Sequence, residues 1–90
     1  MEEVKVTITG RVQMVMYRDF AQRKARSLSL LGFVRNNEDG SVTAVAQGEK
    51  EKLEQFIGFL KKGSMFSKVE NVSVAWKKTA SCFGDFHIMY

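Results

Sequence analysis

The chain has 90 residues, of which 44% are hydrophobic and 27% charged, and its formal net charge is +4 at pH 7. This length and composition favour one domain with a single core and exclude a disordered tail. No apolar run approaches the roughly 18 residues that span a bilayer, and the N-terminus lacks the basic start of a signal peptide. We therefore expect a single domain over residues 1–90, cytoplasmic, without a membrane partner.

Cysteine content and net charge bear on the cellular compartment and on the kind of ligand. Cys82 is the only cysteine, so no internal disulfide can form, and a reducing cytosol is the default compartment. The positive charge suits an anionic ligand, which could be a phosphorylated metabolite or a nucleic acid.

The first half of the chain predicts a strand, a helix and a hairpin. Apolar and polar residues alternate over 4–8, which is typical of a half-buried strand. Apolar residues then recur at helical spacing from about Arg18 to Ser29. Two strands, over 32–37 and 41–47, flank a tight turn at 38–40 that ends in glycine.

The second half predicts one helix and two strands. A helix begins near Glu49, places its apolar residues on one stripe, and ends at Gly63. Valines and Trp76 over 69–76 indicate a fourth strand, and 86–90 indicates a fifth. The order is βαββαβ with a possible split of the last strand. We therefore expect an α+β fold with an antiparallel sheet and two helices on one face.

The segment from Gly10 to Arg18 lies between the first strand and the first helix. A short loop before a helix N-terminus favours an anion, and a guanidinium adds a forked pair of charged donors. This arrangement is typical of a phosphate site, although Met14 and Met16 occupy its centre.

Two motifs resemble the signatures of the acylphosphatase family. Gly-Arg-Val-Gln-x-Val-x-Tyr-Arg at 10–18 is similar to its first signature, and Gly-x-Val-x-Asn-x-x-Asp-Gly-x-Val at 32–42 meets its second. Ala-Gln-Gly at 46–48 and Val-Glu-Asn-Val at 69–72 continue the likeness, so it covers nearly all of the chain in order.

The resemblance implies a ferredoxin-like sandwich that hydrolyses acyl phosphates to a carboxylate and inorganic phosphate. In it, Arg18 and backbone N–H groups of the preceding loop bind the phosphate, and Asn36 orients the attacking water. The implied protein is a hydrolase that needs no metal and no cofactor. We also expect a monomer, as the simplest assembly, and no nucleic-acid partner. The implied phosphate-binding loop consists of Gln13, Met14, Val15, Met16, Tyr17 and Arg18.

Met14 stands where this family has glycine, which leaves two versions of the enzyme hypothesis. If the side chain points outward and the loop N–H groups still converge, the chain is an active acylphosphatase. If the loop is distorted, it is a weak or inactive phosphate-binding relative. We favour retained activity, because Arg18 and Asn36 are both present. Ser29 and Met65 also replace a glycine and a proline that are common in the family.

Other readings of the same residues remain. Arg18 could be a solvated arginine of the first helical turn, and Asn36 could bond its own hairpin, although Asn37 is the better turn residue. An RNA-binding module shares the βαββαβ order, but neither the first nor the third strand carries an aromatic residue on which a base could stack. For the remaining candidates we expect structural or solvent-exposed roles: Arg11, Tyr17, Glu38, Asp39, Cys82 and His87.

Overall fold

A computed structural model describes residues 1–14 and 16–90 of the chain. Five strands and two helices follow one another in the expected order. In chain order the elements are β1 (Glu2–Arg11), α1 (Tyr17–Ser27), β2 (Leu31–Asn36), β3 (Val42–Gly48), α2 (Lys50–Lys62), β4 (Lys68–Lys78) and β5 (Phe86–Met89).

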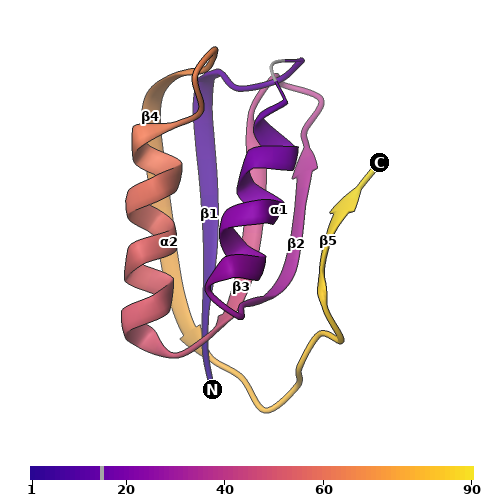
Figure 1. Cartoon of the computed structure of the whole chain (residues 1–90), viewed down its shortest axis with the longest axis vertical. Helices are drawn as coiled ribbons and strands as arrows, with labels where there is room; N and C mark the ends of the chain where they lie inside the picture. The colour runs from indigo at the N-terminus through magenta and orange to yellow at the C-terminus, as the bar shows by residue number, and fades with distance from the viewer. Residues whose placement is uncertain (15) are drawn as a thin grey trace.

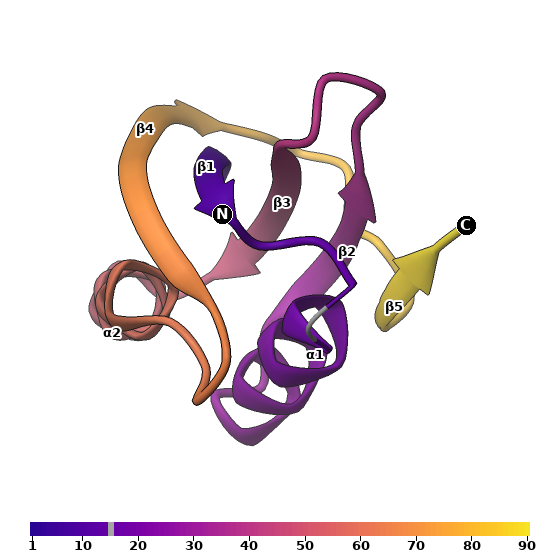
Figure 2. The same ribbon diagram turned by 90° about the horizontal axis from the view of Figure 1, so that it is seen from above.

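The strands form one sheet in the order β4-β1-β3-β2-β5, and both helices pack on the same face of it (Figures 1 and 2). β1 pairs antiparallel with β3 and β4, and β2 pairs antiparallel with β3, as expected. β5 instead pairs parallel with β2, so the sheet is mixed rather than wholly antiparallel. The reason is the segment after β4, which crosses from one edge of the sheet to the other before β5 begins (Figure 1).

The core lies between the helices and the sheet, because alternate residues of each strand face the helices. Val4, Val6 and Ile8 of β1 have no exposed surface, and they pair in register with Ala46, Ala44 and Val42 of β3. The stripe predicted on α2 is buried against them and consists of Leu53, Phe56, Ile57 and Leu60. Burial of this apolar area is the main stabilising contribution to the fold.

Both helices end where the backbone leaves the right-handed region. α1 begins one residue earlier than expected and stops at Ser27, because Ser29 adopts a left-handed conformation with φ 58°. The N–H of Leu30 then donates to the carbonyl of Ala25 at 2.9 Å, which satisfies an orphan carbonyl of the last turn. α2 is followed by Gly63 with φ 80°, as the sequence predicts.

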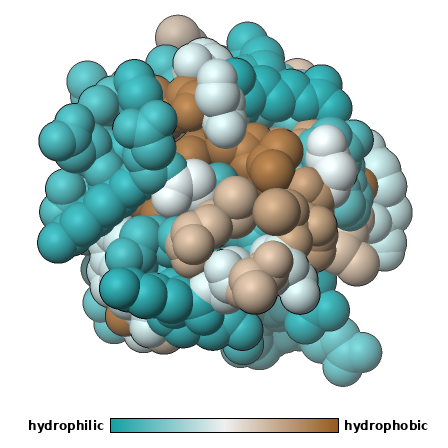
Figure 3. Space-filling model, turned by 90° about the horizontal axis from the view of Figure 1, so that it is seen from below, coloured by the Kyte–Doolittle hydropathy of each residue, from teal (hydrophilic) through white to brown (hydrophobic). Residues whose placement is uncertain are grey.

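The loop between β1 and α1 and the N-terminus mark the two ends of the sandwich (Figure 1). Apolar atoms show among hydrophilic side chains at the N-terminal end (Figure 3), where Met1 and Leu28 line a shallow cleft. Within the described part of the chain, neither helix is long and apolar enough to cross a membrane.

Candidate active site

The loop between β1 and α1 is tied to the turn between β2 and β3. The Gln13 side-chain amide donates from Nε2 to the carbonyl oxygens of Asn37 and Ser41, each at 2.8 Å. The preceding residue, Val12, is 1% exposed and belongs to the core. The loop is therefore fixed at its base by one apolar anchor and one forked pair of hydrogen bonds.

Both methionines of this loop lie in the left-handed region. Met14 has φ 60° and Met16 has φ 58°, and Met16 is the residue that caps α1. Their side chains point into solvent, because Met14 is 100% and Met16 74% exposed. A left-handed conformation at a residue with a Cβ costs roughly 1–2 kcal/mol. Val15, which the sequence assigns to the same loop, lies outside the described residues.

The first N–H groups of α1 have no hydrogen-bond acceptor among residues 1–14 and 16–90. Phe20 N–H donates to the Met16 carbonyl at 3.0 Å, so the earlier N–H groups, of Tyr17, Arg18 and Asp19, precede the first intrahelical bond. Met16 makes no side-chain cap bond to them. A left-handed residue followed by a helical one turns successive N–H groups toward one side, which suits an anion near the positive end of the helix.

Arg18 is held from its other side by the last residues of the chain. Its Nη1 donates to the Met89 carbonyl at 3.1 Å, and its guanidinium carbon lies 4.9 Å from the centre of the Tyr90 ring. These contacts use one donor and one face of the guanidinium. Among residues 1–14 and 16–90, the remaining N–H groups of Arg18 have no partner, and a guanidinium of this kind can make the forked contact with phosphate.

Asn36 ends β2 on the helix-covered face of the sheet, in register with the buried Val42. Its Oδ1 is buried and has no hydrogen-bond partner among residues 1–14 and 16–90. A buried acceptor without a donor is unfavourable, and such an atom is a sign of a ligand or water site. Asn37 differs, because its Nδ2 donates to the hydroxyls of Ser41 and Thr43 at 2.9 and 2.8 Å.

Arg18 and Asn36 line the same cavity, of about 310 Å³. Met14, Met16 and Tyr17 also line it, together with Val12, Asp19, Ile88 and Tyr90. The sequence does not reveal the contribution of Ile88 and Tyr90, because that depends on the parallel pairing of β5 with β2. The apolar residues at the end of the chain are the only sequence signal that could have suggested this contribution to the cavity.

The other candidates have structural roles or lie on the surface. Tyr17 is 1% exposed and donates its hydroxyl to the Leu60 carbonyl at 2.7 Å, and burial raises the pKa of its phenol. Asp39 accepts hydrogen bonds from the hydroxyl and N–H of Ser41, and these hold its pKa below the usual value. Cys82 is exposed, and His87 lies 3.1 Å from Asp85.

The fold and this cavity together define a small α+β domain with a cavity at the N-terminus of its first helix. The family model for acylphosphatase matches residues 4–88. The acylphosphatase of Thermus thermophilus is 46% identical over 98% of this chain and 99% of its own length. That of Bacillus licheniformis is 42% identical over the full length of both proteins.

A solved structure agrees with these sequences. The crystal structure of acylphosphatase from Bacillus subtilis superimposes with a TM-score of 0.97 at 37% identity, and it covers all of both chains. The chain belongs to the acylphosphatase family, and with it to the hydrolases of acyl phosphates.

Proposed function

We propose that this chain hydrolyses acyl phosphates with Arg18 and the N–H groups at the start of α1 holding the phosphate, while Asn36 orients the attacking water. The observation that carries the proposal is the buried Asn36 Oδ1, which has no partner among the described residues and belongs to the cavity that Arg18 lines. An acceptor in that position can receive one O–H of a water molecule and direct its oxygen toward the phosphorus.

The chemistry needs little more than positioning. Water attacks the phosphorus, the bond from phosphorus to the acyl oxygen breaks, and its electron pair leaves on the carboxylate. Both protons of the water end on the phosphate product, so the substrate itself accepts the proton. Because a carboxylate is a good leaving group, placement and charge stabilisation can supply most of the acceleration.

The exposed side chain of Met14 supports the active version of the enzyme. Met14 is among the residues that line the Arg18 cavity, but its side chain is 100% exposed and so is not packed over Arg18, despite the left-handed backbone. We expect Met14→Gly to leave kcat/KM within about threefold, because the thioether side chain offers the phosphate no charge and no hydrogen-bond donor. A much larger gain in turnover would show instead that methionine distorts the loop.

The wider setting is part of the same proposal. We place the protein in the cytoplasm as a monomer that releases inorganic phosphate and needs no metal ion. The lone Cys82 and the chemistry of a good leaving group support this view. Full turnover in the presence of a chelator would test the metal-independent part directly.

The test is hydrolysis of benzoyl phosphate by the purified chain with a chelator present. Arg18→Ala should lower kcat/KM by at least about a hundredfold and weaken inhibition by inorganic phosphate, because the charged donors are lost. Asn36→Ala should lower kcat by about a hundredfold while the inhibition constant of phosphate changes by less than about twofold.

Arg23→Ala is the matched control. Arg23 lies five residues further along α1, its side chain is 72% exposed, and within the described part of the chain its one ion pair is with Asp19 at 3.0 Å. Its loss should leave kcat/KM unchanged, because an exposed i,i+4 pair contributes only a few tenths of a kcal/mol. Full turnover in Asn36→Ala would overturn the role of Asn36, and phosphate inhibition unaffected by Arg18→Ala would overturn that of Arg18.

A further inference from the structure

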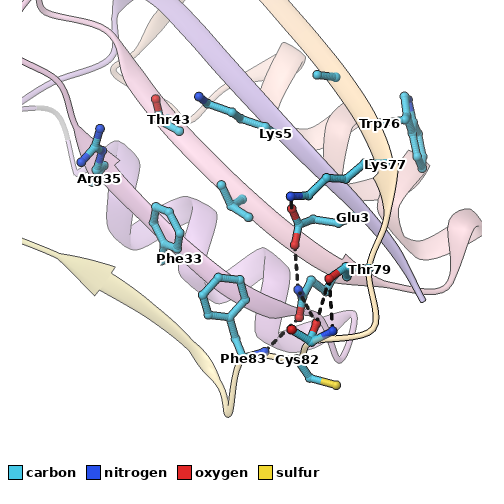
Figure 4. A pocket seen from close by; sticks show the side chains of 14 residues that line it. Glu3, Lys5, Phe33, Arg35, Thr43, Trp76, Lys77, Thr79, Cys82 and Phe83 are labelled. Carbon is cyan, nitrogen blue, oxygen red and sulfur yellow. Dashed lines mark hydrogen bonds and ion pairs between the residues drawn. The ribbon is translucent and has the colours of Figure 1, made fainter.

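A second concave site lies on the face of the sheet that the helices do not cover. This groove has a volume of about 720 Å³ and lies over β1, β3 and β2 (Figure 4). The segment between β4 and β5 closes one end, where Ser81, Cys82 and Phe83 line it. None of the residues that line the Arg18 cavity lines this groove.

One part of the groove is apolar and aromatic. The rings of Phe33 and Phe83 meet edge to face with their centroids 5.6 Å apart. Val45, which pairs in register with Phe33, is 9% exposed beside them. Two aromatic rings next to an aliphatic side chain form a surface on which a flat ring can pack, with aromatic contacts that add to the buried area.

The charges around the groove are mainly positive. Lys77 is already paired, because its Nζ lies 3.2 Å from Glu3 Oε2. Lys5 and Arg35 also line the groove, and neither has a carboxylate at ion-pair distance within the described part of the chain. Figure 4 shows both side chains on the side of the groove near Thr43, with Lys5 on β1 and Arg35 on β2.

The frame of the groove is held by a buried amide. Gln47 is 2% exposed, and its Nε2 donates to Glu3 Oε1 at 2.7 Å and to the Ser81 carbonyl at 3.0 Å. Its Oε1 accepts the N–H of Phe83 at 2.9 Å. These bonds fix the crossing segment, and with it Phe83, against the sheet. They also use the polar atoms of Gln47, so the two free cations are left as the charged recognition groups.

We propose that this groove binds a small aromatic anion, with its ring against Phe33, Val45 and Phe83 and its carboxylate or phosphate between Lys5 and Arg35. The spacing supports this occupant. Arg35 follows Phe33 by two residues on the same face, roughly 7 Å along the strand, and Lys5 lies two strands away, roughly 10 Å across the sheet. A ring with one anionic substituent spans these distances.

The groove and the proposed phosphate site face opposite sides of the sheet. Arg35 and Asn36 are neighbours in β2, and successive side chains of a strand point to opposite faces. The groove is therefore a different binding site from the Arg18 cavity, and binding of a ligand there can be measured without turnover.

The experiment is a titration of the isotope-labelled chain with 2-naphthoate, followed by two-dimensional amide NMR. Shifts should be concentrated at Lys5, Phe33, Arg35, Thr43 and Val45. The double variant Lys5→Gln/Arg35→Gln should raise the Kd about tenfold, as expected for two exposed charge contacts. Neutral 2-naphthalenemethanol and ring-free acetate should each bind at least about tenfold more weakly than 2-naphthoate.

Two control variants separate the groove from other sites. Lys61→Gln/Lys62→Gln makes the same change of charge on α2, on the covered side of the sheet, and should leave the Kd unchanged. Arg18→Gln should do the same. Shifts confined to residues 12–18, a Kd unaffected by Lys5→Gln/Arg35→Gln in a folded variant, or equal binding of the neutral probe would each overturn the proposal.

Discussion

Replacing Met14 with glycine should stabilise the protein, although the substitution removes a large apolar side chain. Met14 has φ 60° and is 100% exposed, so the side chain contributes strain and no packing. Glycine adopts this conformation without steric conflict. At an ordinary exposed position, the same substitution is unfavourable, because glycine gives the unfolded chain more conformational freedom.

The magnitude follows from these two opposing effects. Relief of the left-handed conformation is worth roughly 1–2 kcal/mol, and the added freedom of the unfolded chain opposes it by roughly 0.5–1 kcal/mol. The free energy of unfolding should therefore rise by about 0.5–1 kcal/mol. For a domain of this size, 1 kcal/mol corresponds to a Tm change of about 4–8 °C.

Urea unfolding of Met14→Gly beside Met65→Gly tests this reasoning. Met65 is also a loop methionine, 88% exposed, but it is not among the residues with positive φ. Met65→Gly should lower the free energy of unfolding by about 0.5–1 kcal/mol, so the two variants should move the urea midpoint in opposite directions at the same m-value. If Met14→Gly lowers the midpoint as Met65→Gly does, the left-handed strain at Met14 does not exist.

Three further changes probe the frame around the site. Tyr17→Phe leaves the Leu60 carbonyl without its buried donor and should lower the free energy of unfolding by about 1–2 kcal/mol in urea. Burial raises the pKa of Tyr17 above the ordinary 10.0, so the protonated phenol contributes to the free energy of unfolding below about pH 10 and this contribution is lost as the pH rises further. The loss of stability above about pH 10 should therefore be shallower in Tyr17→Phe. Gln47→Leu removes the three hydrogen bonds that Gln47 makes with Glu3 Oε1, the Ser81 carbonyl and the Phe83 N–H, and should cost about 3 kcal/mol in urea unfolding, with rapid hydrogen exchange at Phe83. Gly32→Ala should prevent folding, since φ is 142° and an added Cβ would overlap the Val45 carbonyl oxygen; Gly84→Ala, where a Cβ meets nothing within 4 Å, should show a wild-type amide spectrum.

Local sequence patterns predict most of the fold. Alternation in β1 and β3 and the apolar stripe on α2 identify which residues face the core, and those residues are buried in the structure. Gly40 and Gly63 mark a turn and a helix end correctly, because positive φ favours glycine. The pairing of β5 could not be obtained in this way, since strand alternation does not indicate which neighbour a strand chooses or in which direction it runs.

The sequence likewise predicts only part of the candidate site. The two motifs predict that Arg18 and Asn36 belong together, and both residues line one cavity in the structure. Met89 and Tyr90 had no local signal, because their contact with Arg18 crosses 71 residues of sequence separation. The groove on the open face was also missed, since its residues come from four strands and the crossing segment and form no motif.

The structure also explains how an unfavourable loop can persist in a small domain. Two left-handed methionines together cost roughly 2–4 kcal/mol, a large part of the stability of an ordinary domain. The two hydrogen bonds of Gln13 contribute about 1–3 kcal/mol in total, and the buried Val12 and Tyr17 fix the loop at both ends. The strain is thus offset by contacts of the residues next to the two methionines, of which Val12 and Tyr17 also line the Arg18 cavity. Met16 makes no side-chain cap bond to the N–H groups at the start of α1, which are the groups that the proposed phosphate site uses as donors.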